Sequence, residues 1–366
     1  MKFECIKEKL KAAVVIAEKA TGKNMSLPIL SGLYLEAIPH KLILRATNLD
    51  IGLELEINAK IEIPGKVVVS ASVLASFLSV APDDERIKVE LIGNNLSLSV
   101  KKNNTIIRTL PVEDFPSIPV VKGEETAVIS GGDLVSGLRA VLPAAASSDI
   151  RPELGSVYVY SDSEYVYFVA TDSFRLAEKK IKKDNPTSFS GVLLPARNAL
   201  EVVRVFENTQ DSVQIEFNKN QIVFIAEGAS LVSRVVSGNF PNYKAIIPKE
   251  GKTKVLLSKK ELLSALRGAS LFTDKTGEVV LRLNPSEGLF EISGKKDDTG
   301  ENTANLEASL EGEAVTMHFN SRYIMDAMAI LSGDLVSLSF SGQGKPLVIT
   351  SPKDTGFLYL AMPLAR

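Results

Sequence analysis

Residues 196–207 read Ala-Arg-Asn-Ala-Leu-Glu-Val-Val-Arg-Val-Phe-Glu, with apolar side chains at Ala199, Val202, Val203 and Phe206. Residues spaced i, i+3, i+4 and i+7 share one face of a helix, so this stretch predicts an amphipathic helix. The same pattern occurs 125 residues earlier and 125 residues later. The earlier set is Leu74, Phe77, Leu78 and Ala81, and the later set is Ile324, Ala327, Met328 and Leu331. The chain therefore contains a threefold repeat.

A second apolar pattern precedes each of these sets. The pairs are Leu10 with Val14, Leu134 with Leu138, and Leu262 with Leu266. Short alternating runs such as 87–91 and 96–100, separated by Gly93-Asn94-Asn95, predict antiparallel hairpins between the helices. We expect an α+β fold of three similar domains, each with two helices on antiparallel sheet, at residues 1–122, 123–250 and 251–366. The repeat could serve stability alone, or it could build a curved or ring-like surface.

The composition indicates an ordinary globular protein. Its 366 residues are 45% hydrophobic and 23% charged, with a formal net charge of −2. That charge predicts no overall attraction to nucleic acid or membrane. Cys5 is the only cysteine, so no intrachain disulfide can form. The sequence has no signal-peptide pattern and no apolar run long enough to span a bilayer, so we expect a cytoplasmic protein without membrane contact.

Positive charge gathers modestly on the predicted helices. The six helical stretches together carry +4, which leaves −6 for the remainder. A surface of this kind would tolerate a polyanion without gripping it, since tight binding takes many fixed phosphate contacts. The same charges would also suit ordinary solvated helix faces. The DNA-facing candidates are Lys11, Lys23, Asn24, Arg139, Arg197, Arg204, Lys259, Lys260, Arg267 and Arg322.

Catalytic groups are sparse. The two histidines, His40 and His318, are far apart in the sequence, and one cysteine gives no zinc cluster. No phosphate-binding glycine loop occurs. Residues 170–177, Ala-Thr-Asp-Ser-Phe-Arg-Leu-Ala, concentrate functional side chains after a strand pattern. A hydrolase-like site at Asp172 is one interpretation, and a turn held by that aspartate is the other.

Five segments carry a resemblance to a known family. They are Leu27-Pro28-Ile29-Leu30, residues 170–176, Gly238-Asn239-Phe240-Pro241-Asn242-Tyr243, Phe319-Asn320-Ser321-Arg322-Tyr323, and Tyr359-Leu360-Ala361-Met362-Pro363-Leu364. In this order and at this chain length they resemble the β subunit of bacterial DNA polymerase III, the sliding-clamp family.

The resemblance implies a non-enzymatic processivity factor without cofactor or metal. Two chains would join head to tail into a ring of six domains around double-stranded DNA, without sequence preference. The expected partners are the replicative DNA polymerase, a separate ATP-driven clamp loader, repair polymerases and mismatch-repair proteins. Heterologous closure would bring the first domain of one chain to the third domain of the other.

The resemblance also implies a peptide pocket between the second and third domains, which would be an apolar groove with a few polar groups. Phe174 and Met362 would form its floor, and Arg175 and Asn320 would supply hydrogen bonds. The expected pocket residues are Arg151, Leu154, Thr171, Ser173, Phe174, Arg175, Leu176, Pro241, Ile246, Asn320, Tyr323, Met362, Pro363 and Leu364. Complementary charges and apolar residues give the expected dimer interface: Lys101, Lys102, Ile107 and Arg108 against Leu271, Phe272, Asp297, Asp298 and Glu301.

Overall fold

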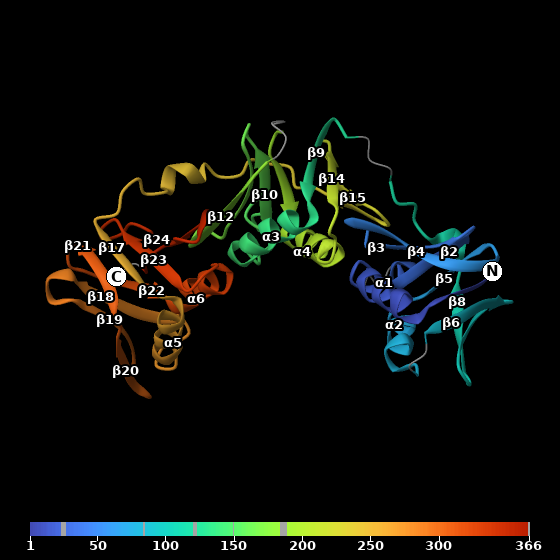
Figure 1. Ribbon diagram of the computed structural model, residues 1–366, viewed down its shortest axis with the longest axis horizontal. Coiled ribbons are helices and arrows are strands. Elements are labelled where there is room, and N and C mark those ends of the chain that lie inside the picture. The colour runs from blue at the N-terminus through green and yellow to red at the C-terminus, as the bar shows by residue number, and fades with distance from the viewer. Residues whose placement is uncertain (23–26, 83–84, 120–122, 149, 184–188, 365–366) are drawn as a thin grey trace. The chain divides into compact units, whose positions relative to one another are not determined.

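The computed structural model describes residues 1–22, 27–82, 85–119, 123–148, 150–183 and 189–364. Its contacts divide the chain into two compact units (Figure 1). Unit 1 combines Met1–Val135 with Arg197–Val235, and unit 2 combines Ser136–Ala196 with Val236–Arg366. The middle repeat is therefore shared between the two units. The domain boundaries expected after residues 122 and 250 refer to the sequence repeats, not to these two units, and they stay a prediction.

Six α-helices occur in the described ranges, two in each repeat as predicted. They are α1 (Lys7–Lys19), α2 (Ala71–Val80), α3 (Gly131–Val141), α4 (Ala196–Phe206), α5 (Lys259–Ser270) and α6 (Ser321–Ile330). Their predicted apolar faces are buried: Leu10, Leu74, Leu138, Val202, Leu266 and Ile324 are each at most 1% exposed. Figure 1 shows α1 beside α2, and α5 beside α6, each pair on one side of its strands. The helical spacing in the sequence thus identified the core.

Side chains fix where four of these helices begin, including α3, where Ser130 accepts a hydrogen bond from the main-chain N–H of Asp133. Ser70 accepts a hydrogen bond from the main-chain N–H of Val73 at the start of α2, and Ser258 accepts one from Glu261 at the start of α5. Asn320 accepts one from Arg322 at the start of α6. Serine and asparagine suit this position because their oxygens satisfy a helix N–H that has no partner inside the helix.

One antiparallel sheet of twelve strands forms the strand layer of unit 1. Its order is β1 (Lys2–Ile6), β6 (Arg86–Ile92), β7 (Asn95–Val100), β8 (Asn103–Leu110), β5 (Gly65–Ser70), β2 (Gly32–Ile38), β3 (Lys41–Thr47), β4 (Ile51–Ile63), β16 (Ala229–Arg234), β15 (Gln221–Ala226), β14 (Ser212–Phe217) and β9 (Glu125–Ser130). The β4–β16 pair joins a first-repeat strand to a middle-repeat strand, with Leu53 opposite Leu231.

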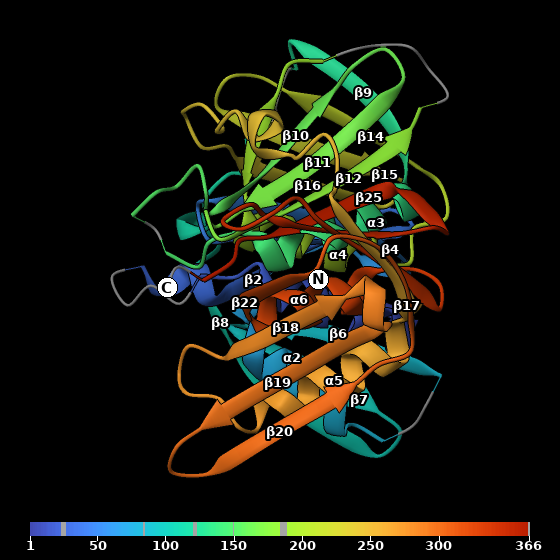
Figure 2. The ribbon, with the colours of Figure 1, turned by 90° about the vertical axis from the view of Figure 1, so that its left-hand side faces the viewer.

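Two antiparallel sheets form the strand layer of unit 2. The nine-stranded sheet runs β13 (Val192–Pro195), β10 (Ser156–Ser161), β11 (Tyr165–Thr171), β12 (Arg175–Lys182), β25 (Asp354–Ala361), β24 (Leu347–Ser351), β23 (Leu335–Phe340), β17 (Thr253–Ser258) and β21 (Ala308–Gly312). The four-stranded sheet runs β20 (Gly300–Asn305), β19 (Leu289–Lys296), β18 (Glu278–Asn284) and β22 (Val315–Asn320). Figure 2 shows β20, β19 and β18 side by side in front of α5.

The β12–β25 pair repeats the β4–β16 junction one repeat later, here between middle-repeat and third-repeat strands, with Leu176 opposite Leu360. Backbone pairing therefore continues through each repeat boundary, which explains why the compact units do not coincide with the sequence repeats. Within the described ranges, no helix is long and apolar enough to cross a membrane.

Candidate functional site

The turn between β11 and β12 holds residues 171–175 by side chain–backbone hydrogen bonds. The Thr171 hydroxyl donates to the main-chain oxygen of Arg175 at 2.6 Å. Asp172 Oδ1 accepts from the main-chain N–H groups of Phe174 and Arg175, both at 2.9 Å. Ser173 adopts a positive φ of 79°, which the tight turn requires. Asp172 therefore forms the turn, as one of the two interpretations expected.

The same turn occurs one repeat earlier, between β3 and β4. Thr47 donates to the main-chain oxygen of Ile51 at 2.6 Å, and Asn48 Oδ1 accepts from the N–H groups of Asp50 and Ile51. An amide thus does at residue 48 what the carboxylate does at residue 172. The turn belongs to the repeated fold, and it needs no negative charge at that position.

Arg175 leaves this turn with its guanidinium held on several sides. Its Nε donates to Asp172 Oδ2 at 2.9 Å, and its Nη1 donates to Asp326 of α6. Its guanidinium carbon lies 4.7 Å from the centre of the Tyr323 ring, and the side chain is 14% exposed. A planar cation held by two carboxylates and an aromatic face has a fixed position.

A cavity of about 220 Å³ opens beside this turn in unit 2. Its lining is mostly apolar, with a few hydroxyl, amide and guanidinium groups. The lining residues, which we call the pocket, are Arg151, Leu154, Thr171, Ser173, Arg175, Leu176, Pro241, Asn242, Tyr243, Ile246, Leu360 and Met362. A concave apolar site with few polar groups is the usual form of a site for a small ligand or a peptide anchor.

Four separate stretches supply the pocket: residues 151–154, the 171–176 turn, the segment 241–246, and the end of β25 with the tail that follows it. The tail is fixed by its main chain. The N–H of Met362 donates to the main-chain oxygen of Phe174 at 2.8 Å, and the N–H of Leu364 donates to that of His318 at 2.8 Å. The C-terminal stretch thus bridges the turn and β22.

Nine of the fourteen residues expected at the pocket line this cavity. The remaining five are Phe174, Asn320, Tyr323, Pro363 and Leu364. Phe174 was expected in the floor, but its side chain is 60% exposed, and its main-chain oxygen accepts the hydrogen bond from Met362. Asn320 was expected to offer hydrogen bonds to a ligand, but its side-chain oxygen caps α6. The Tyr323 ring packs against the guanidinium of Arg175, which lines the cavity.

Three lining residues were missed: Asn242, Tyr243 and Leu360. The first two belong to the segment 238–243, and Leu360 lies in the C-terminal segment, so both stretches had already been singled out in the sequence. The alternation of β25 could have placed Leu360 on the same side as Met362, since residues two apart in a strand share a face.

Three family models match the chain in tandem. They describe the N-terminal domain of the DNA polymerase III beta subunit at residues 1–119, its central domain at 129–242 and its C-terminal domain at 244–365. The chain belongs to the DNA polymerase III beta subunit family.

Relatives of this family match over the full chain. The beta sliding clamp of Bacillus subtilis is 28% identical, covering 100% of this chain and 99% of the relative. That of Synechococcus elongatus is 25% identical over the same shares. A crystal structure of the DNA polymerase III beta subunit of Thermotoga maritima superposes with a TM-score of 0.94 at 27% identity, covering 100% of this chain and 99% of that one. The fold of three tandem clamp domains is thereby confirmed.

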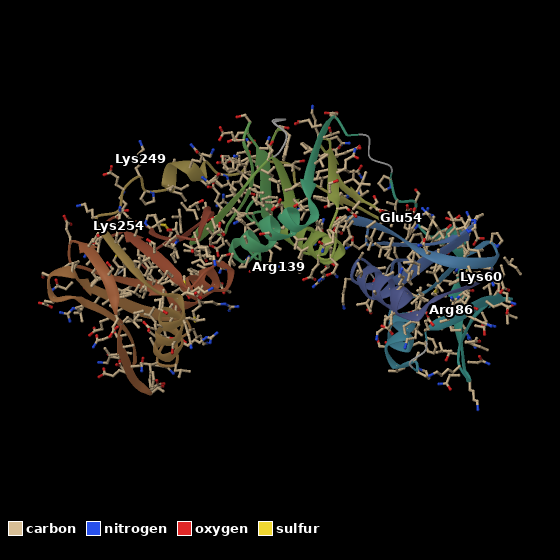
Figure 3. The ribbon with its side chains drawn as sticks, viewed as in Figure 1. Glu54, Lys60, Arg86, Arg139, Lys249 and Lys254 are labelled. Carbon is tan, nitrogen blue, oxygen red and sulfur yellow. The ribbon has the colours of Figure 1, made fainter. Side chains whose placement is uncertain are left out.

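Most DNA-facing candidates lie in solvent. Arg139, Arg197, Arg204, Lys260, Arg267 and Arg322 are exposed, and Lys11 is partly exposed. Some have acidic neighbours: Arg197 bonds Asp50 at 2.9 Å, and Arg204 pairs with Glu201. Figure 3 shows Arg139 on the helical side of its unit, and Lys249 and Lys254 on the strand side. Lys23 and Asn24 lie outside the described residues. DNA contact by this set stays a prediction.

Lys259 requires a correction as a DNA-facing candidate. Its Nζ donates a hydrogen bond of 2.7 Å to the main-chain oxygen of Leu331, at the end of α6. The side chain is half-buried between two helices. Its charge therefore compensates the carbonyl groups at a helix C-terminus.

Ile107 requires a correction as a dimer-interface candidate. Alternation along β8 turns Ile107 into the core, where it is 5% exposed, and leaves its neighbour Ile106 67% exposed. The other candidates are accessible to a partner: Leu271 is 72% exposed, and Phe272 is half-buried. Lys101, Lys102, Arg108, Asp297, Asp298 and Glu301 are exposed.

Proposed function

We propose that this chain is a DNA sliding clamp: a non-catalytic processivity factor whose two copies close into a ring around duplex DNA. The pocket would dock short peptides of the replicative polymerase, the clamp loader and repair proteins. One observation carries this proposal: nine of the residues that the family resemblance implied for a peptide pocket line one apolar cavity. An enzyme built on Asp172 gains no support from the geometry, because that carboxylate accepts hydrogen bonds from Phe174 and Arg175 within its own turn.

Peptide docking is supported by the chemistry of the pocket. Leu154, Leu176, Leu360 and Met362 offer apolar contact area, and the fixed guanidinium of Arg175 adds a cation at the wall. An apolar peptide side chain would lose its contact with water there. Such anchors carry much of the affinity of small interfaces.

Ring closure is supported by two free strand edges, one in the first repeat and one in the third. Among the described residues, 103–108 of β8 pair only with β7, because β5 meets β8 only through Val68 and Val69. Within the same ranges, β20 is the end strand of the four-stranded sheet. Such edges invite pairing with another chain. Basic Arg108 lies on the first edge, with Lys101 and Lys102 in the turn before it, and acidic Glu301 lies on the second edge, with Asp297 and Asp298 in the turn before that.

A peptide titration tests the docking function. A fluorescent peptide from the C-terminus of the replicative polymerase of the same organism is titrated with the wild-type chain and with Met362→Ala. We expect the variant to bind roughly 5- to 150-fold more weakly, which corresponds to losing a buried anchor of about 1–3 kcal/mol.

The matched control is Leu335→Ala, which removes a leucine that is 46% exposed in the same unit and does not line the pocket. It should bind the peptide like the wild type. Equal affinities of all three proteins would show that this cavity is not the docking site.

A further inference from the structure

The segment that joins β16 to β17 forms a wall of the pocket, although it has little regular structure of its own. Residues 236–252, which we call the linker, contain one 3-10 turn, η4 (Tyr243–Ile246). They nevertheless supply Pro241, Asn242, Tyr243 and Ile246 to the lining. A single short turn has little stability by itself. Side-chain contacts must therefore hold this wall in place.

Tyr243 provides the central contact. Its ring is 5% exposed and packs in a core cluster with Val169, Leu176 and Leu360. Its hydroxyl donates to the carboxylate of Glu178 on β12. The Tyr160 hydroxyl lies 2.7 Å from the hydroxyl oxygen of Tyr243. Because the one proton of Tyr243 goes to the carboxylate, Tyr160 is the donor of that second bond.

Stacked rings and one cation extend this contact across the sheet. The rings of Tyr160 and Tyr167 are parallel within 3°, with centroids 4.6 Å apart. The Nζ atom of Lys244 lies 5.3 Å from the centre of each ring. An ammonium over aromatic faces is attracted by their negative potential. We call Tyr160, Glu178, Tyr243 and Lys244 the linker clasp.

The first repeat shows that a linker can cross the sheet without this arrangement. There the corresponding linker follows β8, and its described part is residues 111–119. The ring of Phe115 packs against Tyr34 at a tilt of 33°, with centroids 5.3 Å apart, and the ring of Phe240 stacks on Tyr158 with centroids 5.0 Å apart. At the positions of Tyr160, Glu178 and Tyr243, however, the first repeat has Glu36, Glu54 and Ile118. Arg45 pairs there with both glutamates, at 2.8 and 2.5 Å.

The hollow in this part of unit 1 measures about 620 Å³, with Tyr34, Arg45, Glu54 and Ile118 among its lining. A phenylalanine packed against a tyrosine of the sheet is thus common to both repeats, whereas the hydroxyl-to-carboxylate chain occurs in the repeat whose linker lines the pocket. A purely structural need to cross the sheet would apply to both linkers equally.

We propose that Tyr243 is a positioning residue of the docking site: through the clasp it fixes the linker, so that Pro241 and Ile246 form a rigid wall before a peptide arrives. The inference rests on the proposed docking function. A wall that is already ordered reduces the entropy lost on binding, and so raises affinity. Without the clasp, only a fraction of the molecules would present the closed wall, and the apparent affinity would fall by that fraction.

The test uses hydroxyl deletions that keep the rings. Tyr243→Phe removes the central hydroxyl, and Tyr160→Phe removes the donor behind it at a residue that does not line the pocket. The control is Tyr165→Phe on β11, which also lies outside the lining. With the polymerase peptide, we expect Tyr243→Phe to bind about 3- to 10-fold more weakly, Tyr160→Phe about 2- to 5-fold, and the control to match the wild type. The double variant should bind the peptide about as tightly as Tyr243→Phe alone, because both substitutions interrupt the same chain of hydrogen bonds.

Amide hydrogen exchange of the free proteins supplies the readout that a general loss of stability would not reproduce. The clasp predicts faster exchange confined to the amides of residues 242–247 in Tyr243→Phe, with β23 and β24 unchanged. Faster exchange across unit 2 would show a purely structural role and overturn the proposal. Unchanged affinity in Tyr243→Phe would also overturn it and leave the docking function intact. A wild-type chain that binds no such peptide would overturn the docking function and this proposal together.

Discussion

The Nζ atom of Lys259 donates a hydrogen bond of 2.7 Å to the main-chain oxygen of Leu331, which ties the start of α5 to the end of α6. Lys7 holds the same position in the first repeat, where its Nζ lies 3.0 Å from the main-chain oxygen of Pro82. Gly131 holds it in the middle repeat, where a Cβ atom would lie 2.6 Å from the main-chain oxygen of Thr209. The first and third repeats thus use a lysine that the middle repeat cannot accommodate.

Removing this lysine should weaken the third repeat. Lys259→Met deletes the ammonium and leaves the carbonyl at the helix end without it, so we expect the free energy of unfolding to fall by about 1–2 kcal/mol. The exposed neighbour Lys260 is the control, and Lys260→Met should change stability by less than about 0.5 kcal/mol. Urea denaturation of both variants measures the difference. Equal stabilities would contradict the structural role of Lys259.

Replacing Arg175 by lysine should be costly although it keeps the charge. A lysine cannot reach Asp172 and Asp326 at once while it covers the Tyr323 ring. We expect Arg175→Lys to lower the free energy of unfolding by about 1–3 kcal/mol, whereas Arg267→Lys, at an exposed position, should be neutral. A neutral result at residue 175 in thermal or urea unfolding would show that the paired geometry contributes little.

The sequence predicted the repeat well because the helices bury most of their apolar faces, although Phe77 of α2 is only partly buried. Leu74, Ala199 and Ile324 are at equivalent positions and are each at most 1% exposed. The side-chain roles of Lys259 and Ile107 were less accessible to prediction. A lysine on a helix gives no sign in the sequence that its amine turns toward a second helix 72 residues away. In Ile106-Ile107, two adjacent isoleucines do not reveal which one faces inward, and a one-residue change of register exchanges them.

The pocket was predictable where it depends on the repeated turn, and less so where it depends on the linker. Thr171, Ser173 and Arg175 follow from the strand-end pattern and the resemblance. Tyr243 was missed because its hydroxyl bonds Glu178 and Tyr160, which lie 65 and 83 residues away in the sequence. Such long-range pairs leave no local periodicity to detect.

The exposed isoleucine of β8 should matter for self-association. Ile106→Glu places a charge at the free edge of unit 1, so we expect a dimer to dissociate to monomers at micromolar concentration. Val128 is 57% exposed on β9, the last strand in the order of the same sheet, and Val128→Glu should leave the dimer intact. Light scattering after gel filtration gives the mass. A dimeric Ile106→Glu chain would place the interface elsewhere.

The single cysteine should resist modification in the folded chain. Burial, and then the nearby Glu4 carboxylate, raise the pKa of the Cys5 thiol to about 12. A raised thiol pKa means less thiolate, which is the reactive form, at any lower pH. At pH 8 we expect iodoacetamide to label the native chain at least roughly 100-fold more slowly than the chain in urea, as followed by mass spectrometry. Comparable rates would show that Cys5 is accessible and ionised.

The ring itself is tested most directly by the topology of bound DNA. The chain is loaded on a nicked circular plasmid by the clamp loader of the same organism with ATP, and the complex is isolated by gel filtration. Half of the sample is then cut once by a restriction enzyme. A ring held by topology predicts that the chain stays with the circle and slides off the linear DNA, at an ionic strength that suppresses phosphate contacts. Equal retention on circular and linear DNA would contradict encirclement and would show binding by direct contact.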